Sequence, residues 1–288
     1  MNENPDSAFY LYGLTRPDLV LKVTAASPSD TADLPPEPAG AVVLEGGGID
    51  GEHPPFCWCH GDSAAILSLV SREEFCGPAA DANLQDLAWV GPRVCRHQAV
   101  LEQTMPFAPV LPARFGTLFS SLEALGQFME RHREAIARFL EGVTGLEEWA
   151  VKGLLDRGLA EEEFVRQQLA EGKARPAASP GLAYLHEEQA RLKAKAGLED
   201  WLAGACGTVL EELAPLASEG CPRPVLSRET TGADQEMVLN WAFLVPRRAL
   251  AEFRKRVERV NASQTRPGLT FALSGPWPPY SFCPALDS

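Results

Sequence analysis

The chain has 288 residues, a length typical of one large or two medium-sized domains. Hydrophobic residues make up 45% of it, enough for a sizeable core, and 39 acidic against 26 basic residues give a formal net charge of −13. This balance argues against nucleic acid or an anionic membrane surface as the main partner, because both select for basic patches.

The N-terminal residues 1–6 contain neither the basic region nor the apolar region of a secretory signal peptide. No segment approaches the roughly 18 apolar residues that a membrane-spanning helix requires. We therefore expect a soluble, cytoplasmic protein. The cysteines are odd in number and scattered, which predicts reduced and mostly buried thiols. They stand at positions 57, 59, 76, 95, 206, 221 and 283.

The first half is predicted to combine short strands with two helical regions. Residues 27–40 contain four prolines and are typical of a loop. A helix is predicted over 84–105, in two pieces, because Pro92 cannot donate to the preceding turn. Ser121 offers an N-cap for one long helix over 122–140, with apolar residues at three- and four-residue steps. Strands are expected at 9–14, 41–44, 64–71 and 107–111.

The second half is predicted to follow a different order of elements. Two helices, 159–171 and 181–217, are joined by a linker at 172–178, and Ser179-Pro180 is typical of a helix start. A third, charged helix is expected over 249–260. Strands are expected at 146–155, 222–229, 237–245 and 269–273.

This order predicts an α+β protein of two domains, at 1–142 and 143–288. Each domain is expected to be a ferredoxin-like type of sheet with packed helices. The first ends in a long helix. The second follows a βαββαβ plan, carries a helical hairpin in its first crossover and ends in an aromatic tail.

Few residues suggest chemistry. The loop 46–51 fits GxGxxG, but Pro54 and Pro55 follow where a dinucleotide site needs a helix to begin, so we interpret it as a plain glycine loop. Cys57, Cys59 and His60 are the best metal candidates, yet they lack a second ligand cluster, which favours ordinary strand or loop residues. His97 is interpreted as a satisfied, half-buried histidine, since no nucleophile or carboxylate is evident beside it.

Two strings stand out instead. In Val110–Thr117 an apolar run ends in Pro112 and is followed by Arg114, Phe115, Gly116 and Thr117. An arginine in apolar surroundings needs a partner, and Glu147 or Glu148 could supply one across the domain junction; contact with another protein is the alternative. The C-terminal string 274–282 places Trp277 and Tyr280 among prolines, and we expect it to cover the protein's own core rather than a partner.

Several strings in order resemble the gas vesicle accessory proteins of the GvpL/GvpF family. The Pro-rich segment 27–40 and the Cys57–His60 region depart from the family pattern. The matching strings are 10–13, 69–75, 84–90, 96–100, 110–117, 148–152, 179–185 and 275–282.

The resemblance implies a two-domain protein that takes part in building gas vesicles, the hollow protein shells that give buoyancy to prokaryotic cells. It implies an assembly factor or minor shell component, located in the cytoplasm and at the vesicle. Its expected partners are the small hydrophobic shell protein and other accessory proteins. No catalytic residue, cofactor or metal is implied. The family-motif residues Arg114, Phe115, Gly116, Thr117, Trp277 and Tyr280 are expected to be structural.

A shell protein monomer would aggregate through its apolar surface, and we hypothesise that this protein covers that surface. Exposed strand edges in either half of this chain could pair with the shell protein. Two other hypotheses about the function remain. One is a zinc- or thiol-dependent enzyme centred on Cys57, Cys59 and His60. The other is a protein–protein adaptor unrelated to vesicles.

Overall fold

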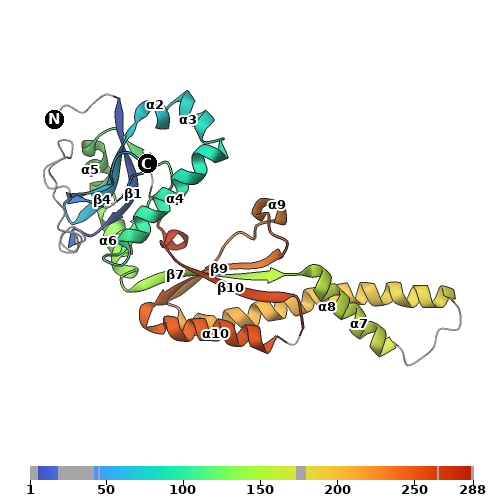
Figure 1. Ribbon diagram of the computed structural model, residues 1–288. Helices are drawn as coiled ribbons and strands as arrows, with labels where there is room; N and C mark the ends of the chain where they lie inside the picture. Colours follow the sequence, from blue (N-terminus) through green and yellow to red (C-terminus); the bar gives the residue numbers. More distant parts are fainter. Residues whose placement is uncertain (1–5, 19–41, 45, 173–179, 265, 287–288) are drawn as a thin grey trace. The chain divides into compact units, whose positions relative to one another are not determined.

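The computed structural model describes residues 6–18, 42–44, 46–172, 180–264 and 266–286. The chain divides into two compact units, of which unit 1 comprises 1–145 with 278–288 and unit 2 comprises 146–277. Each unit is an antiparallel sheet with packed helices (Figure 1), so the predicted α+β class is confirmed. The boundary after Gly145 lies close to the one expected after Gly142. The C-terminal segment, expected in the second domain, is grouped with the first.

The unit 1 sheet has the strand order β2-β3-β4-β1-β5, with β6 pairing beside β5 on β1. Apart from the two-residue edge strand β2 and the short β6, the order β5-β1-β4-β3 is the fourth-first-third-second order of a ferredoxin-like sheet, as predicted. The strands are β1 (Ser7–Thr15), β2 (Val42–Val43), β3 (Phe56–His60), β4 (Ser63–Ser71), β5 (Val110–Pro112) and β6 (Leu118–Phe119).

The helices of unit 1 correct two predictions. Helix α4 (Leu87–Thr104) runs unbroken through Pro92. Since Pro92 lies in the second turn, it removes only one helical bond, and the Asp86 side chain caps the start by accepting from the amide of Ala88. The single helix predicted over 122–140 is two, which meet at His132, where φ is −104° and ψ is 12°. The described part of unit 1 also contains the helices α2 (Arg72–Phe75), α3 (Pro78–Asn83), α5 (Leu122–Arg131) and α6 (Arg133–Gly142).

Strand β1 supplies side chains to two separate cores. Tyr10 and Tyr12 pack on one face of the sheet with Val100 and Leu101 of α4. Leu11 packs on the other face with Leu125 of α5 and other apolar residues of α5 and α6. This alternation is the period of two of a strand buried on both faces, so unit 1 is a sheet between two helical layers.

Unit 2 has the strand order β10-β7-β9-β8, with every pair antiparallel. Numbered within the unit, this is the fourth-first-third-second order of a ferredoxin-like sheet. The predicted strand 222–229 is wrong: β8 ends at Pro222, and α9 (Arg228–Thr231) follows. Pro222 and Pro224 lack the amide hydrogens a longer ladder would need. The strands are β7 (Leu146–Leu155), β8 (Glu219–Pro222), β9 (Glu236–Pro246) and β10 (Leu269–Trp277).

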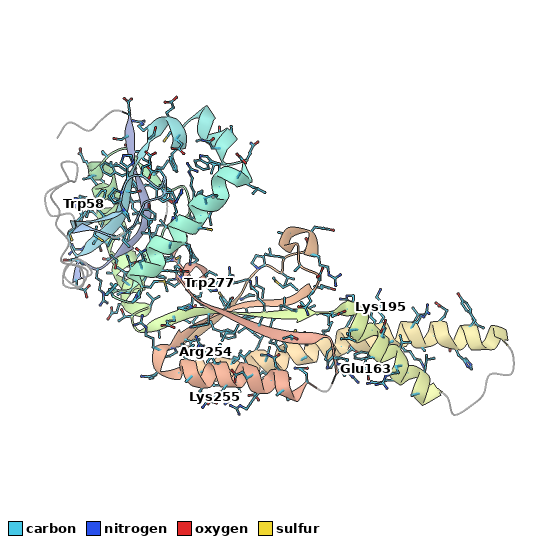
Figure 2. The ribbon with its side chains drawn as sticks, in the orientation of Figure 1. Trp58, Glu163, Lys195, Arg254, Lys255 and Trp277 are labelled. Carbon is cyan, nitrogen blue, oxygen red and sulfur yellow. The ribbon has the colours of Figure 1, made fainter. Side chains whose placement is uncertain are left out.

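Helices α7 (Arg157–Gly172) and α8 (Pro180–Leu213) form the helical hairpin predicted for the first crossover. Helices α8 and α10 (Leu250–Ser263) lie along one face of the sheet (Figure 1). Arg254 of α10, labelled in Figure 2, stacks over Trp149 with its guanidinium carbon 4.6 Å from the ring centroid. The predicted loop 27–40, the Ser179 cap and nearly all of the predicted linker lie outside the described residues.

Candidate functional site

Residues Arg114–Thr117 form a tight turn between β5 and β6. The amide and the hydroxyl of Thr117 both donate to the carbonyl of Arg114, at 3.1 and 2.7 Å. Gly116 has φ of +83°, a backbone conformation that favours glycine. The glycine of the sequence motif is therefore required by the turn itself.

The buried Tyr10 of β1 packs under this turn and is hydrogen-bonded to it. Its hydroxyl accepts a hydrogen bond from the amide of Gly116 at 3.2 Å and lies 2.8 Å from Nδ1 of His97. The ring of Phe115 meets Tyr10 and His97 edge-on, with centroids 6.2 and 6.1 Å away. A strand, a helix and the turn are thus joined through one buried tyrosine.

The histidine and the tyrosine of this cluster are both neutral at pH 7. His97 is 3% exposed, and burial lowers its pKa to about 4, while the nearby backbone of Ala113 acts in the opposite direction. Burial also raises the pKa of Tyr10. Tyr10 can therefore donate to an unprotonated Nδ1. The sequence interpretation of His97 as a satisfied, half-buried histidine is therefore correct only in part: the ring is fully buried, Nδ1 is paired with Tyr10, and Nε2 has no hydrogen-bond partner among the described residues.

The neighbouring Tyr12 anchors the glycine loop. Its hydroxyl accepts from the amide of Ile49 at 2.6 Å and lies 3.0 Å from Oγ of Ser68, while Arg96 donates to the carbonyl of Ile49 at 3.3 Å. No helix begins directly after Gly51. The loop interpretation is confirmed, and the loop packs on the core of unit 1.

Arg114 itself is exposed, so the prediction of an apolar environment that demands a partner is wrong. Glu147 pairs with Arg247 at 3.2 Å, and the buried Glu148 lies 3.8 Å from Arg223, both within unit 2. The run of apolar neighbours in the sequence was misleading because the turn directs the guanidinium outward.

Five of the six motif residues belong to unit 1 and Trp277 belongs to unit 2. Trp277 ends β10 (Figure 2), where its Nε1 donates to Ser274 at 3.3 Å. Tyr280 belongs to unit 1 and is 40% exposed. The core of unit 1 is contacted by Cys283 and Leu286, which follow the 274–282 string, so the expectation that the string itself covers the core stays a prediction.

Strand β3 separates the zinc candidates. His60 stacks on Trp58, with ring centroids 5.1 Å apart, on the face that packs against α5. Cys57 is buried in the core on the opposite face. The alternation of a strand therefore prevents Cys57, Cys59 and His60 from converging on one ion. The prediction of mostly buried thiols is also wrong, since Cys57 is buried while Cys59 and Cys95 are exposed.

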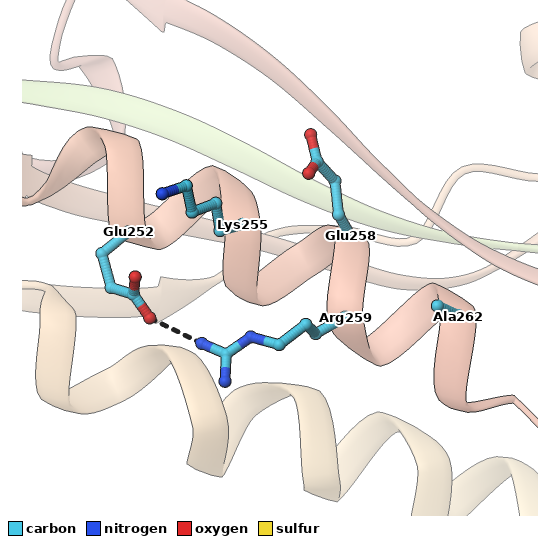
Figure 3. Close-up of a pocket in the computed structure, with 5 residues that line it drawn as sticks. All are labelled: Glu252, Lys255, Glu258, Arg259 and Ala262. Atoms are coloured by element: carbon cyan, nitrogen blue, oxygen red, sulfur yellow. Dashed lines mark hydrogen bonds and ion pairs between the residues drawn. The ribbon is translucent and has the colours of Figure 1, made fainter.

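A surface hollow on α10 offers no better site. It is lined by residues of one helix, and Arg259 donates to Glu252 at 2.6 Å within it (Figure 3). Exposed charges that satisfy one another do not make a binding pocket. Within the described residues, no helix has the length and hydropathy to span a membrane. The lining residues are Glu252, Lys255, Glu258, Arg259 and Ala262.

Comparisons with known proteins agree with the resemblance. The chain is 31% identical over 248 residues to gas vesicle protein L of Streptomyces sp. (strain CB03234), which covers 85% of this chain and 89% of that protein. It is 27% identical over 201 residues to gas vesicle protein F of Dolichospermum flosaquae, covering 66% of this chain and 76% of that protein.

Two crystal structures share the fold. That of gas vesicle protein GvpF from Anabaena sp. PCC7120 has a TM-score of 0.66 at 20% identity, covering 97% of this chain and 99% of that one. That of GvpF from Microcystis aeruginosa has a TM-score of 0.62 at 19% identity, covering 96% and 99%. The profile of the family described as gas vesicle synthesis protein GvpL/GvpF matches residues 8–284. This chain therefore belongs to the GvpL/GvpF family of gas vesicle proteins.

Proposed function

We propose that the protein is a non-catalytic assembly factor or minor shell component, which binds the small hydrophobic gas vesicle shell protein and other accessory proteins. The observation that carries the proposal is the family match over residues 8–284, nearly the whole chain. Its place of action would be the cytoplasm and the growing vesicle.

The chemistry of the motif residues supports a scaffolding role. Gly116 and Thr117 use their hydrogen-bonding groups to build a turn, and Tyr10 and His97 are buried and neutral beneath it. A general base or nucleophile would need access to a reacting group. The formal charge of −13 favours solubility when an apolar partner is bound.

Binding through the strand edges of unit 2 has little support. Asn261 donates to the carbonyl of Phe271 and accepts from its amide, both at 2.8 Å, so it occupies the first part of the β10 edge. Pro276 and the irregular pairing between Ser274 and Trp277 interrupt the edge further along. At the opposite edge, β8 is short and ends in a proline. The earlier hypothesis of strand pairing is therefore less favoured in unit 2 than a contact with a helix face.

Co-expression with a gas vesicle shell protein tests the proposal. We expect the shell protein to move into the soluble fraction and to co-purify with this chain. Deleting the gene should reduce or abolish vesicles in electron micrographs, and a plasmid copy should restore them. The proposal is wrong if the two proteins neither co-purify nor change each other's solubility and the deletion strain forms normal vesicles.

A further inference from the structure

The outward face of α4 in unit 1 is free of charge over several turns. Leu87 is 85% exposed and Val94 is 44% exposed, and Leu84 just before the helix is 53% exposed. Every exposed residue of α4 from Leu87 to Ala99 is apolar or small. In a chain with 23% charged residues, such a face is unusual for a solvated helix. These residues are Leu87, Ala88, Gly91, Pro92, Val94, Cys95 and Ala99.

The charged residues of this part of α4 are turned inward. Arg93 stacks over Trp89, with its guanidinium carbon 4.0 Å from the ring centroid, and both side chains bind Glu74 of α2. Arg96 reaches the carbonyl of Ile49. Two arginines that could have made the face soluble instead attach the helix to its own unit.

The face also has the shape of a helix-packing surface. Gly91, Cys95 and Ala99 continue from Leu87 at four-residue steps, so they line one side of the helix, with Val94 beside Leu87 and Gly91 on its flank. No atom lies within 4 Å of where a Cβ of Gly91 would be. A second helix could approach the backbone closely along this line.

The charges at the two ends of the α4 face indicate which kind of partner helix could bind there. Asp86 at the start and Glu102 beyond the far end are both acidic and exposed. A second copy packed in either direction would bring these acids together, which is unfavourable for a chain of charge −13. A partner helix with an apolar centre and basic residues at its ends would complement the face.

We propose that this α4 face, residues 87–99, docks an apolar helix with basic ends, and that this helix belongs to the shell protein. The second half of that statement rests on the proposed function. In this binding mode the partner helix packs its apolar side against the α4 face. The acidic residues at the two ends of the face pair with its basic ends and so fix its position along α4.

Two variants test the face, each with a matched control. Gly91→Leu fills the open line, and Leu87→Glu places a charge on it. Gly204→Leu and Leu192→Glu make the same changes on exposed positions of α8, where Gly204 also has open space and Leu192 is 70% exposed. The recovery of co-expressed shell protein should fall about tenfold or more for the α4 variants and remain unchanged for the α8 variants, as for a central contact. Circular dichroism of each variant checks that it is folded.

The outcomes separate the inference from the proposed function. If the wild type and both α4 variants recover equal shell protein, the docking face is refuted and the proposed function stands. Equal losses in the α8 variants would also refute it. If the wild-type chain recovers no shell protein, the docking face is refuted, and the vesicles of the deletion strain then decide the proposed function. A wild-type dimer that Gly91→Leu converts to a monomer would identify a second copy as the occupant, against the proposal.

Discussion

At the scale of single residues, the turn Arg114–Thr117 shows how backbone geometry decides which residue a position requires. Gly116 has a positive φ and gives its amide to Tyr10. No atom lies within 4 Å of where its Cβ would be, so a side chain would not clash. The requirement for glycine is conformational.

We therefore predict that Gly116→Ala lowers the free energy of unfolding by about 1–2 kcal/mol, the cost of a left-handed alanine. Gly91→Ala is the contrasting control, because it lies in a regular helix and should stabilise the protein by up to about 1 kcal/mol. Urea denaturation measures both changes. A neutral Gly116→Ala variant would contradict the assigned role.

His97 leads to a prediction about pH. The unfolded histidine binds a proton near pH 6.5, whereas the folded one does so only near 4. The unfolded state therefore holds more protons between these values, and stability falls as the pH falls through this window. This group should cost about 2 kcal/mol of stability between about pH 7 and pH 5.

Urea denaturation at a series of pH values compares the wild type with His97→Gln, which should show a shallower decline between these pH values. His186→Gln, on the exposed surface of α8, should keep the wild-type slope. Equal slopes for the wild type and His97→Gln would show that the buried ring does not govern the loss.

At the scale of elements, the edge of β10 depends on a residue of the helix before it. In an antiparallel ladder, alternate residues direct their backbone groups away from the paired strand. Phe271 does so, and the Asn261 amide takes the place of a neighbouring strand. Asn261 also begins an Asn-Ala-Ser glycosylation sequence, but its side chain is used inside the fold.

Replacing Asn261 with alanine should lower the free energy of unfolding by about 1–3 kcal/mol, since two buried backbone groups lose their partner. The exposed edge should also promote self-association, visible by light scattering. Lys255→Ala, on the exposed side of the same helix, is the control. A variant that is as stable and as monomeric as this control would disprove the protective role.

At the scale of the whole molecule, the chain returns to unit 1 after completing unit 2. Residues 278–288 are grouped with 1–145, and Cys283 and Leu286 contact the core beneath α5 and α6. The thiol of Cys283 lies 3.9 Å from the carbonyl of Pro112 in β5. The stability of unit 1 should therefore depend on the last residues of the chain.

Truncation after Trp277 should destabilise unit 1 more than unit 2. Hydrogen exchange should quicken in peptides covering β5 and α5 and stay near wild-type rates in α10. A chain that lacks only residues 287–288 keeps Cys283 and Leu286 and serves as the control. Faster exchange confined to unit 2, or no change at all, would contradict the assignment of the tail.

The sequence determined the elements whose signals are local. The alternation of residues 237–245 predicted β9, the pattern at 146–155 predicted β7 with its bounds, and the Ser121 cap predicted the start of α5. The order of elements predicted the sheet of unit 2, and the ordered motifs identified the family. Periodicity and capping act over a few residues, so they can be seen in the sequence alone.

Only the tertiary structure decided how distant residues meet. It showed that α4 continues through Pro92, that the helix over 122–140 breaks at His132, and that Arg114 is exposed. It joined Tyr10 to His97 and placed the C-terminal segment in unit 1. These outcomes depend on burial and hydrogen bonds between residues far apart in the chain, where packing energy outweighs local preference.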